Sequence, residues 1–119
     1  MADEQTLNID QGAYWSQVIE WQDANSAPIN LTGYTARMQI RRKVTSADSL
    51  LELTTTNGRI TLGGVLGTIT LAIAAADTAA LPATPSDRRW YYDLELVPAG
   101  GNVVRLLQGR VVVSPEVTR

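Results

Sequence analysis

The sequence predicts an all-β fold: a single antiparallel β-sandwich, Ig-like or jelly-roll-like, with about seven or eight strands and one short helix near residues 75–81. Three observations predict it. Short segments alternate apolar with polar side chains, as strands with one buried face do. Turn-forming residues separate these segments at intervals of roughly eight to twelve residues. The chain has 119 residues and a mass of 12.9 kDa, which is room for one domain, so residues 1–119 are predicted to form a single β-sandwich domain.

The first two predicted strands cover residues 15–22 and 34–42. In both segments, most of the residues at alternate positions are apolar or aromatic, which indicates one buried face and one exposed face. Turn-forming residues at 23–28 separate the two strands. The positions predicted to point inward are Trp15, Gln17, Ile19 and Trp21 in the first strand, and Tyr34, Ala36, Met38 and Ile40 in the second.

The middle of the chain predicts three short strands, at residues 50–56, 59–62 and 68–73. Asn57 and Gly58 separate the first two. Because both residues tolerate a positive φ, they predict a type I′ hairpin at this point. The glycine-rich residues 63–67 predict the next turn.

The last part of the chain predicts a helix followed by two long strands. Residues 74–81 have helical composition, and the prolines that follow end this segment after about two turns. A single short helix among strands predicts a crossover connection, and Asp77 is expected to stabilise its start. The strands cover residues 89–97 and 103–113, and a hairpin loop at 98–102 joins them.

Composition and charge exclude several classes of function. Ten Lys and Arg against twelve Asp and Glu give a net charge of −2 and a pI near 5.0, so no overall positive field attracts nucleic acid or an anionic membrane. The chain has no His and no Cys. This excludes Ser-His-Asp and Cys-His catalytic arrangements and zinc held by His or Cys. We therefore expect a protein that is not an enzyme and holds no metal or cofactor.

Hydropathy and the first residues bear on location. No apolar segment approaches the roughly 20 residues that span a bilayer. The acidic first residues differ from the positively charged start of a secretory signal. We expect a product made in the cytoplasm that has no membrane partner.

Asp93 and Glu95 are the most visible candidates for acid–base chemistry. The period-two spacing of a strand places both on one face, about 7 Å apart at Cα. Such a carboxylate pair suits glycoside hydrolysis in principle. Every strand with one buried face also needs a polar side, however, and a solvated sheet face is the interpretation we favour.

A cluster of arginines beside aromatic residues is the main candidate interaction site. Cations interleaved with rings can stack on single-stranded nucleic acid. The net negative charge of the chain favours a protein interface instead, where Arg and Tyr are enriched. The local pattern offers these arginines no partner within their own strands. The candidate interface residues are Arg37, Arg41, Arg42, Arg88, Arg89 and Tyr91.

Several motifs along nearly the whole chain carry a resemblance. They are DQGAYW at 10–15, PINLTGYTARMQIR at 28–41, GTITL at 67–71, DTAAL at 77–81, YDLEL at 92–96, RLLQG at 105–109 and VSPEV at 113–117. In these the chain resembles a small family of virion proteins of tailed bacteriophages. The order of a glycine, an aromatic strand, Leu31-Thr32-Gly33 and a second strand is also similar to the N-terminal β-sandwich of the baseplate upper protein of Gram-positive phages.

The resemblance implies a non-enzymatic structural or adaptor component of the virion, in the tail or baseplate where fibres attach. Such a protein contacts other virion proteins in a symmetric assembly, is present in multiple copies and is made in the host cytoplasm. Residues 82–89 form a longer and more polar connection than the resemblance leads us to expect. This loop is therefore a further candidate contact.

The alternative function is a carbohydrate-binding β-sandwich module that contacts host-surface glycan. It depends on exposed aromatic rings, because such rings stack on sugars. Trp15 and Trp21 share a face with Ile19, which favours packing in the core over exposure.

Overall fold

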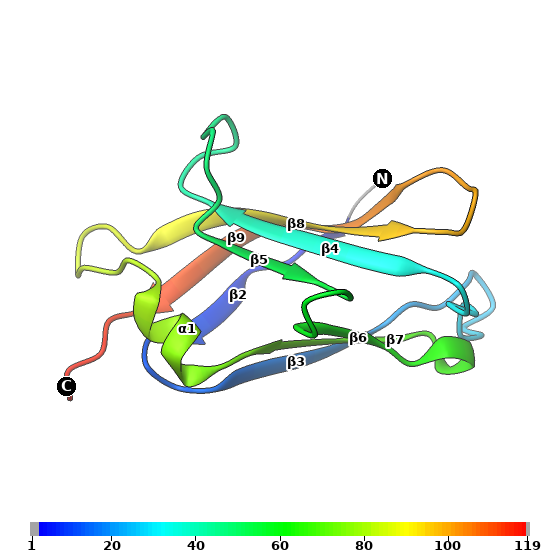
Figure 1. Ribbon diagram of the computed structural model, residues 1–119, viewed down its shortest axis with the longest axis horizontal. Helices are drawn as coiled ribbons and strands as arrows, with labels where there is room; N and C mark the ends of the chain where they lie inside the picture. The colour runs from blue at the N-terminus through cyan, green and yellow to red at the C-terminus, as the bar shows by residue number, and fades with distance from the viewer. Residues whose placement is uncertain (1–2, 119) are drawn as a thin grey trace.

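Two β-sheets face each other across a hydrophobic core (Figure 1). The computed structural model describes residues 3–118, so residues 1, 2 and 119 of the predicted domain lie outside the described residues. The β-sandwich predicted from the sequence is confirmed. Within the described residues the chain forms nine strands, one short α-helix and one turn of 3-10 helix.

The larger sheet has six strands in the order β1-β9-β8-β4-β5, with β2 also paired to β9. The smaller sheet has three strands in the order β3-β7-β6. The strands of the larger sheet are β1 (Asp3–Glu4), β2 (Leu7–Asp10), β4 (Thr35–Arg41), β5 (Leu51–Thr54), β8 (Arg89–Val97) and β9 (Val104–Ser114). Those of the smaller sheet are β3 (Trp15–Glu20), β6 (Ile60–Leu62) and β7 (Thr68–Ile73).

Two connections behave as the sequence predicts. The 3-10 turn η1 (Gly64–Leu66) joins β6 to β7 in the glycine-rich segment. The helix α1 (Ala75–Ala80) carries the chain from β7 in the smaller sheet to β8 in the larger one, so it is a crossover connection. Neither helix of residues 3–118 combines the length and the hydropathy that a bilayer crossing requires.

The first two strands were not predicted, and they run parallel to β9 rather than antiparallel. Leu7 and Ile9 are fully buried while their neighbours are exposed, so β2 does alternate, but over only four residues. Because Gly109 of β9 has no side chain, the backbone at Gln5, between β1 and β2, can approach it closely. A side chain there would meet Gln5 O at 2.5 Å, and φ at Gly109 is +150°. The Tyr92 hydroxyl then donates to Gln5 O at 2.8 Å.

The prediction of a type I′ hairpin at Asn57–Gly58 is wrong. β5 pairs with β4 and β6 pairs with β7, so the turn carries the chain between sheets instead of joining paired strands. Gly58 has a positive φ of 81°, and Asn57 does not have one. The Asn57 side chain closes the turn, since its Oδ1 accepts the backbone N–H groups of Thr54 and Arg59, both at 3.0 Å.

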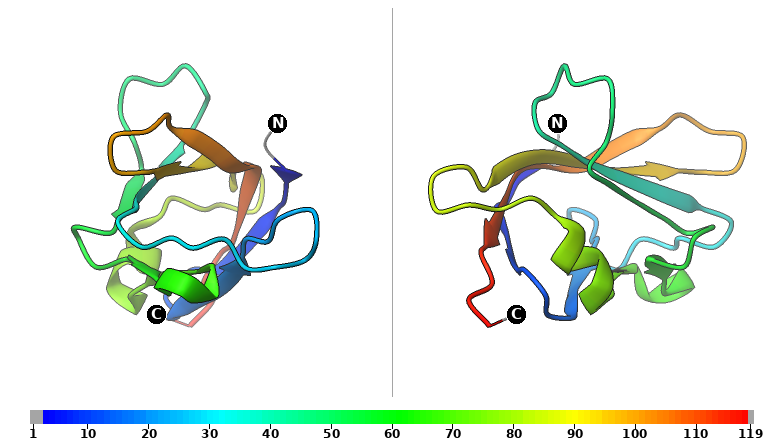
Figure 2. Two further views of the ribbon diagram at one scale, coloured as in Figure 1. Left: turned by 90° about the vertical axis from the view of Figure 1, so that its right-hand side faces the viewer. Right: turned by 60° about the vertical axis from the view of Figure 1, so that its left-hand side comes forward.

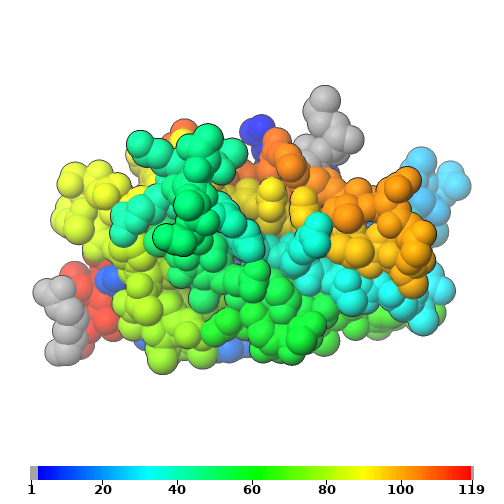
Figure 3. Space-filling view, turned by 45° about the horizontal axis from the view of Figure 1, so that its top comes forward, coloured from blue at the N-terminus to red at the C-terminus, as the bar shows by residue number. Residues whose placement is uncertain are grey.

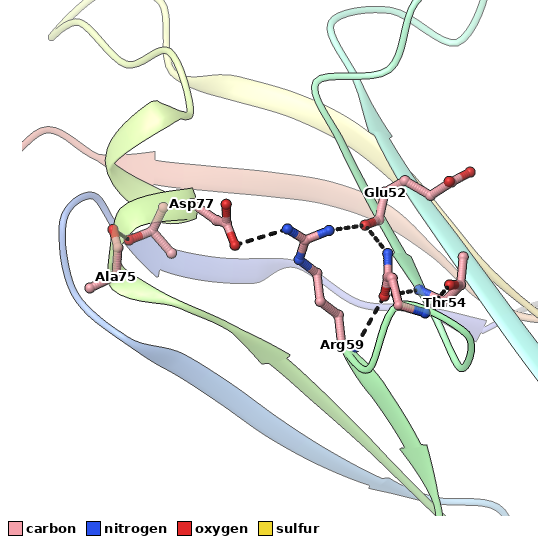
Figure 4. Close-up of polar contacts among 7 residues, drawn as sticks. Glu52, Thr54, Arg59, Ala75 and Asp77 are labelled. Atoms are coloured by element: carbon pink, nitrogen blue, oxygen red, sulfur yellow. Dashed lines mark hydrogen bonds and ion pairs between the residues drawn. The ribbon is translucent and has the colours of Figure 1, made fainter.

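Arg59 ties this turn to the helix (Figure 4). Its guanidinium donates to Asp77 Oδ2 at 3.0 Å and to the carbonyl oxygen of Glu52 at 3.1 Å. Asp77 lies in the first turn of α1, where a carboxylate is favourable, as the sequence predicts. The same carboxylate also anchors the connection between the sheets.

The core is built by the predicted alternation. The inward side chains of β4 and β8 are buried, and those of β3 are partly buried and pack against the same cluster. Thr78 is the one buried polar side chain recorded for the described residues. Its Oγ1 donates to Ala13 O at 2.8 Å and accepts the N–H of Gly12 at 3.1 Å. Thr78 thereby attaches α1 to the turn that leads into β3.

Candidate interaction surface

The outward side chains of β4, β8 and β9 form one continuous polar surface on the larger sheet, which we call the outer face. Strand register aligns them in three rows across the sheet. The rows are Arg37, Glu95 and Arg105; Gln39, Asp93 and Gln108; and Arg41, Tyr91 and Arg110. Period-two alternation directs these side chains outward on β4 and β8. On β9 a register shift opposite Leu94 and Glu95 brings Arg105 into the first row, although it lies three residues before Gln108.

Ion pairs connect neighbouring strands of the outer face. Arg37 Nε lies 2.8 Å from Glu95 Oε1, and Arg105 Nε lies 3.5 Å from Asp93 Oδ2. Both carboxylates of the candidate acid–base pair thus meet an arginine. Because both arginine side chains are about half exposed, solvent screens these pairs and each contributes only about 0 to 1 kcal/mol to folding.

The expectation that the arginines have no partner within their own strand is wrong for Arg41. Its Nη2 donates to Gln39 Oε1 at 2.6 Å, and its Nη1 donates to Ser46 O at 2.8 Å. The second bond holds the loop 43–50, which stands above the larger sheet (Figure 2). The local pattern could not show this contact, because Ser46 belongs to a loop with no periodicity.

Asp93 lies at the centre of the outer face. Burial raises the pKa of its carboxyl group, and the neighbouring Glu95 raises it further. Arg105, Arg37 and Arg41 act in the opposite direction without cancelling the rise. Burial also raises the pKa of Tyr92, on the inward side of the same strand, to about 12. A carboxylate that is costly to ionise favours a partner that brings a hydrogen-bond donor or a cation.

Shallow hollows cover the outer face, and Asp93 lines three of them. One, of about 250 Å³, lies between Arg41, Tyr91 and Asp93, with Val44 of the overhanging loop at its rim. Val44 is 77% exposed. The loop overlies part of the surface in the space-filling view (Figure 3). A broad, hollowed and charged face fits a macromolecular partner better than a small ligand.

The structure brings together four of the six predicted interface residues. Arg37 and Arg41 on β4 and Arg89 and Tyr91 on β8 point outward from adjacent strands. Sequence reasoning did not include Arg105 and Arg110 of β9, which complete the rows. Residues 103–113 do not alternate regularly, because a register shift opposite Leu94 and Glu95 interrupts the pattern, so the sequence alone did not mark Arg105 and Arg110 as outward-facing.

The other two predicted residues lie elsewhere. Arg42 follows β4, and its guanidinium carbon sits 4.9 Å from the ring centroid of Trp90, whose side chain is buried. Arg88 precedes β8 and lines a hollow of about 190 Å³ with the loop residues 85–87 and Arg89. The loop predicted as a further contact is therefore a separate surface at the end of the sandwich.

The tryptophans on which the glycan hypothesis depends are packed against the core. Trp15 and Trp21 are partly buried against the core cluster. Trp21 also makes an edge-to-face contact with Tyr34, with 6.4 Å between ring centroids. The interpretation of these rings as core residues, which the sequence favoured, matches the structure.

Within residues 3–118, no group of three or more Asp, Glu, His or Cys side chains lies close enough together to hold a metal ion. The same residues leave no buried side-chain nitrogen or oxygen without a partner. The fold and the outer face together define a class: a small β-sandwich domain whose polar groups are arrayed on the face of a sheet.

Comparison with known families identifies the chain more closely. The model of the LtfC-like β-sandwich domain family matches residues 2–114. The chain therefore belongs to the LtfC-like β-sandwich family, which is phage-related. No curated protein matches the chain.

Proposed function

We propose that this protein is a non-enzymatic structural or adaptor component of a phage virion, situated in the tail or baseplate and acting through contacts with other virion proteins. Membership of a phage-related β-sandwich family over almost the whole chain is the observation that carries the proposal. The outer face supplies a contact surface of the kind that such a role requires.

Three properties of the outer face support a protein partner. Arginine and tyrosine side chains are enriched in protein interfaces. The ion pairs of Arg37 and Arg105 restrict these two long side chains in part before a partner binds, which reduces the entropy lost on binding. Cations that meet a partner's carboxylates set the register and the rate of association.

Two observations support the proposed absence of catalysis: the amino-acid composition and the ion pairs that the candidate carboxylates form. The sequence has no His or Cys to act as a base or nucleophile. The two carboxylates that sequence spacing singled out, Asp93 and Glu95, are each paired with an arginine.

Charge reversal on the outer face tests the proposal. We expect Arg41→Glu to leave the circular dichroism spectrum unchanged and the midpoint of thermal unfolding within a few degrees of wild type, because Arg41 is only partly buried and its two hydrogen bonds hold a neighbouring surface side chain and a loop rather than the core. We expect the same variant to be incorporated into phage particles at least tenfold less than wild type in a complementation assay.

Two variants control this experiment. Thr61→Glu adds a negative charge to the exposed face of the smaller sheet, on the other side of the sandwich, and should be incorporated normally. Arg88→Glu reports separately on the loop 82–88. Incorporation of Arg41→Glu at the wild-type copy number would exclude the outer face as the contact, and absence of the wild-type protein from particles would overturn the virion assignment.

A further inference from the structure

We propose that the open edge of β3 pairs antiparallel with β3 of a second copy of this chain, with Val18 opposite the partner's Val18. The pairing would join two three-stranded sheets into one continuous sheet across a two-fold axis. It deepens the proposed function by naming one partner in the assembly. Only its role in the virion rests on that function.

The outer edge of β3 is open. β3 is the first strand of the smaller sheet, and its register with β7 continues over six residue pairs without a shift. The N–H of Trp21 donates to Gly67 O at 2.8 Å, continuing the same ladder. Bonding alternates every second residue in an antiparallel pair, so the odd-numbered residues face β7. Ser16, Val18 and Glu20 therefore direct their N–H and C=O groups away from β7, and nothing in the described part of the chain bonds to them there.

This edge lacks most of the features that usually prevent edge-to-edge pairing. Proteins protect edges with very short strands, bulges, prolines or lysines. β3 has six residues, whereas the other edge strands of the described chain have two, four, four and three. It contains no Pro or Lys and has a regular register, and its one charged side chain, Glu20, lies at its last position. Val18 is apolar and 61% exposed at its centre.

The side chains select one register for two copies. With Val18 opposite the partner's Val18, Ser16 lies opposite the partner's Glu20, and Glu20 lies opposite the partner's Ser16. The two Glu20 carboxylates are thereby kept apart, and each can accept a hydrogen bond from a serine hydroxyl. Moving the register by two pairs in one direction would set Glu20 directly opposite the partner's Glu20, which is destabilising.

The same register also brings compatible side chains of the two copies together on the inward side of the strand. It places Trp15 opposite the partner's Trp21, and both rings are only partly buried in the single chain. Aromatic cross-strand pairs are among the more stabilising contacts in antiparallel sheets. A second copy is thus complementary to β3 in its backbone, in its outward side chains and in its aromatic residues.

Cysteine cross-linking tests the pairing directly. The natural sequence has no Cys, so Val18→Cys introduces a single thiol. Hydrogen-bonded antiparallel pairs have Cα atoms about 5.5 Å apart, within the range that a disulfide bridges. We expect Val18→Cys to form a disulfide-linked dimer on mild oxidation in at least tenfold higher yield than Thr61→Cys. Thr61 is exposed on the same sheet face, but its strand lies on the far side of β7.

Sedimentation velocity on the unmodified protein gives the second readout. We expect a monomer–dimer equilibrium between about 10 μM and 1 mM. Val18→Lys should weaken dimerisation at least tenfold, while Thr61→Lys leaves it unchanged. A wild-type protein that stays monomeric at about 1 mM, or equal cross-linking of the two cysteine variants, would overturn the proposal.

Charge at position 16 tests the register. Ser16→Lys sets a cation opposite the partner's Glu20 and should tighten the dimer about two- to fivefold, whereas Ser16→Glu should weaken it by a similar factor. Equal effects of the two changes would exclude this register. Because these measurements use purified protein, a dimer in solution together with absence from phage particles would contradict the proposed function alone.

Discussion

Single residues hold parts of this fold that the sequence pattern does not explain. Thr78 has no signal in the sequence beyond its place in an alanine-rich helix, yet it is fully buried and bonded to the turn before β3. Asp93 was predicted to lie on a solvated face, and it does lie on the outer face, where burial nevertheless raises its pKa. Both properties arise from contacts between distant segments, which periodicity within one segment cannot reveal.

Thr78→Val should destabilise the protein by about 1 to 3 kcal/mol. The substitution keeps the shape of the side chain but leaves the N–H of Gly12 and the carbonyl of Ala13 without their partner. Urea unfolding measures the change. Thr70→Val, on the exposed side of β7, is the matched control and should stay within about 0.5 kcal/mol of wild type.

Asp93→Asn should stabilise the protein at pH 7 and have less effect at pH 3. The pKa of Asp93 is raised by folding, so the ionised carboxylate opposes folding above that pKa, and the penalty disappears once the group is protonated in both states. The gain should stay below about 1 kcal/mol because the side chain is partly exposed. Urea unfolding at the two pH values checks it, and a larger gain at pH 3 would contradict this cause.

At the scale of elements, the sequence predicted what depends on local alternation. Strand β8 was predicted at residues 89–97 and β7 at 68–73, and both have these bounds. Three features needed partners far along the chain and were not predictable: the parallel pairing of β1 and β2, the sheet change at Asn57–Gly58 and the β9 residues of the outer face. The pairing of distant strands, including the contribution of β9 to the outer face, was therefore the least predictable part.

Gly109→Ala should weaken the parallel edge of the larger sheet. A methyl group at this position would lie 2.5 Å from Gln5 O, so the segment that carries β1 must move and the hydrogen bond from Tyr92 lengthens. We expect a loss of about 1 to 3 kcal/mol and faster amide exchange at Gln5, which donates to Gln108 O at 3.0 Å.

Gly58→Ala separates this steric effect from backbone strain. Gly58 also has a positive φ, but its added methyl group would meet nothing within 4 Å. A Gly109→Ala variant that is no less stable than Gly58→Ala, with unchanged exchange at Gln5, would show that the close approach does not limit the fold.

At the scale of the molecule, the two sheets differ in chemistry. The larger sheet exposes rows of Arg, Asp, Glu and Gln, whereas the exposed side chains of the smaller sheet are mostly Ser, Thr, Val and Ala. Composition predicted the acidic balance of the whole chain but not this division, because it arises only when strands from distant segments pair. Four arginines, Arg37, Arg41, Arg105 and Arg110, share the outer face of a molecule whose net charge is −2.

The position of β3 in the smaller sheet has a consequence for valency. Pairing through that strand leaves the outer face of the larger sheet free in both copies, so the dimer would present two identical binding surfaces. A partner array with matching spacing would engage both at once. The second contact then becomes intramolecular, and avidity can exceed the affinity of one face by about 100- to 10,000-fold. Individually weak contacts on the outer face would suffice to retain such a dimer in a repeating assembly.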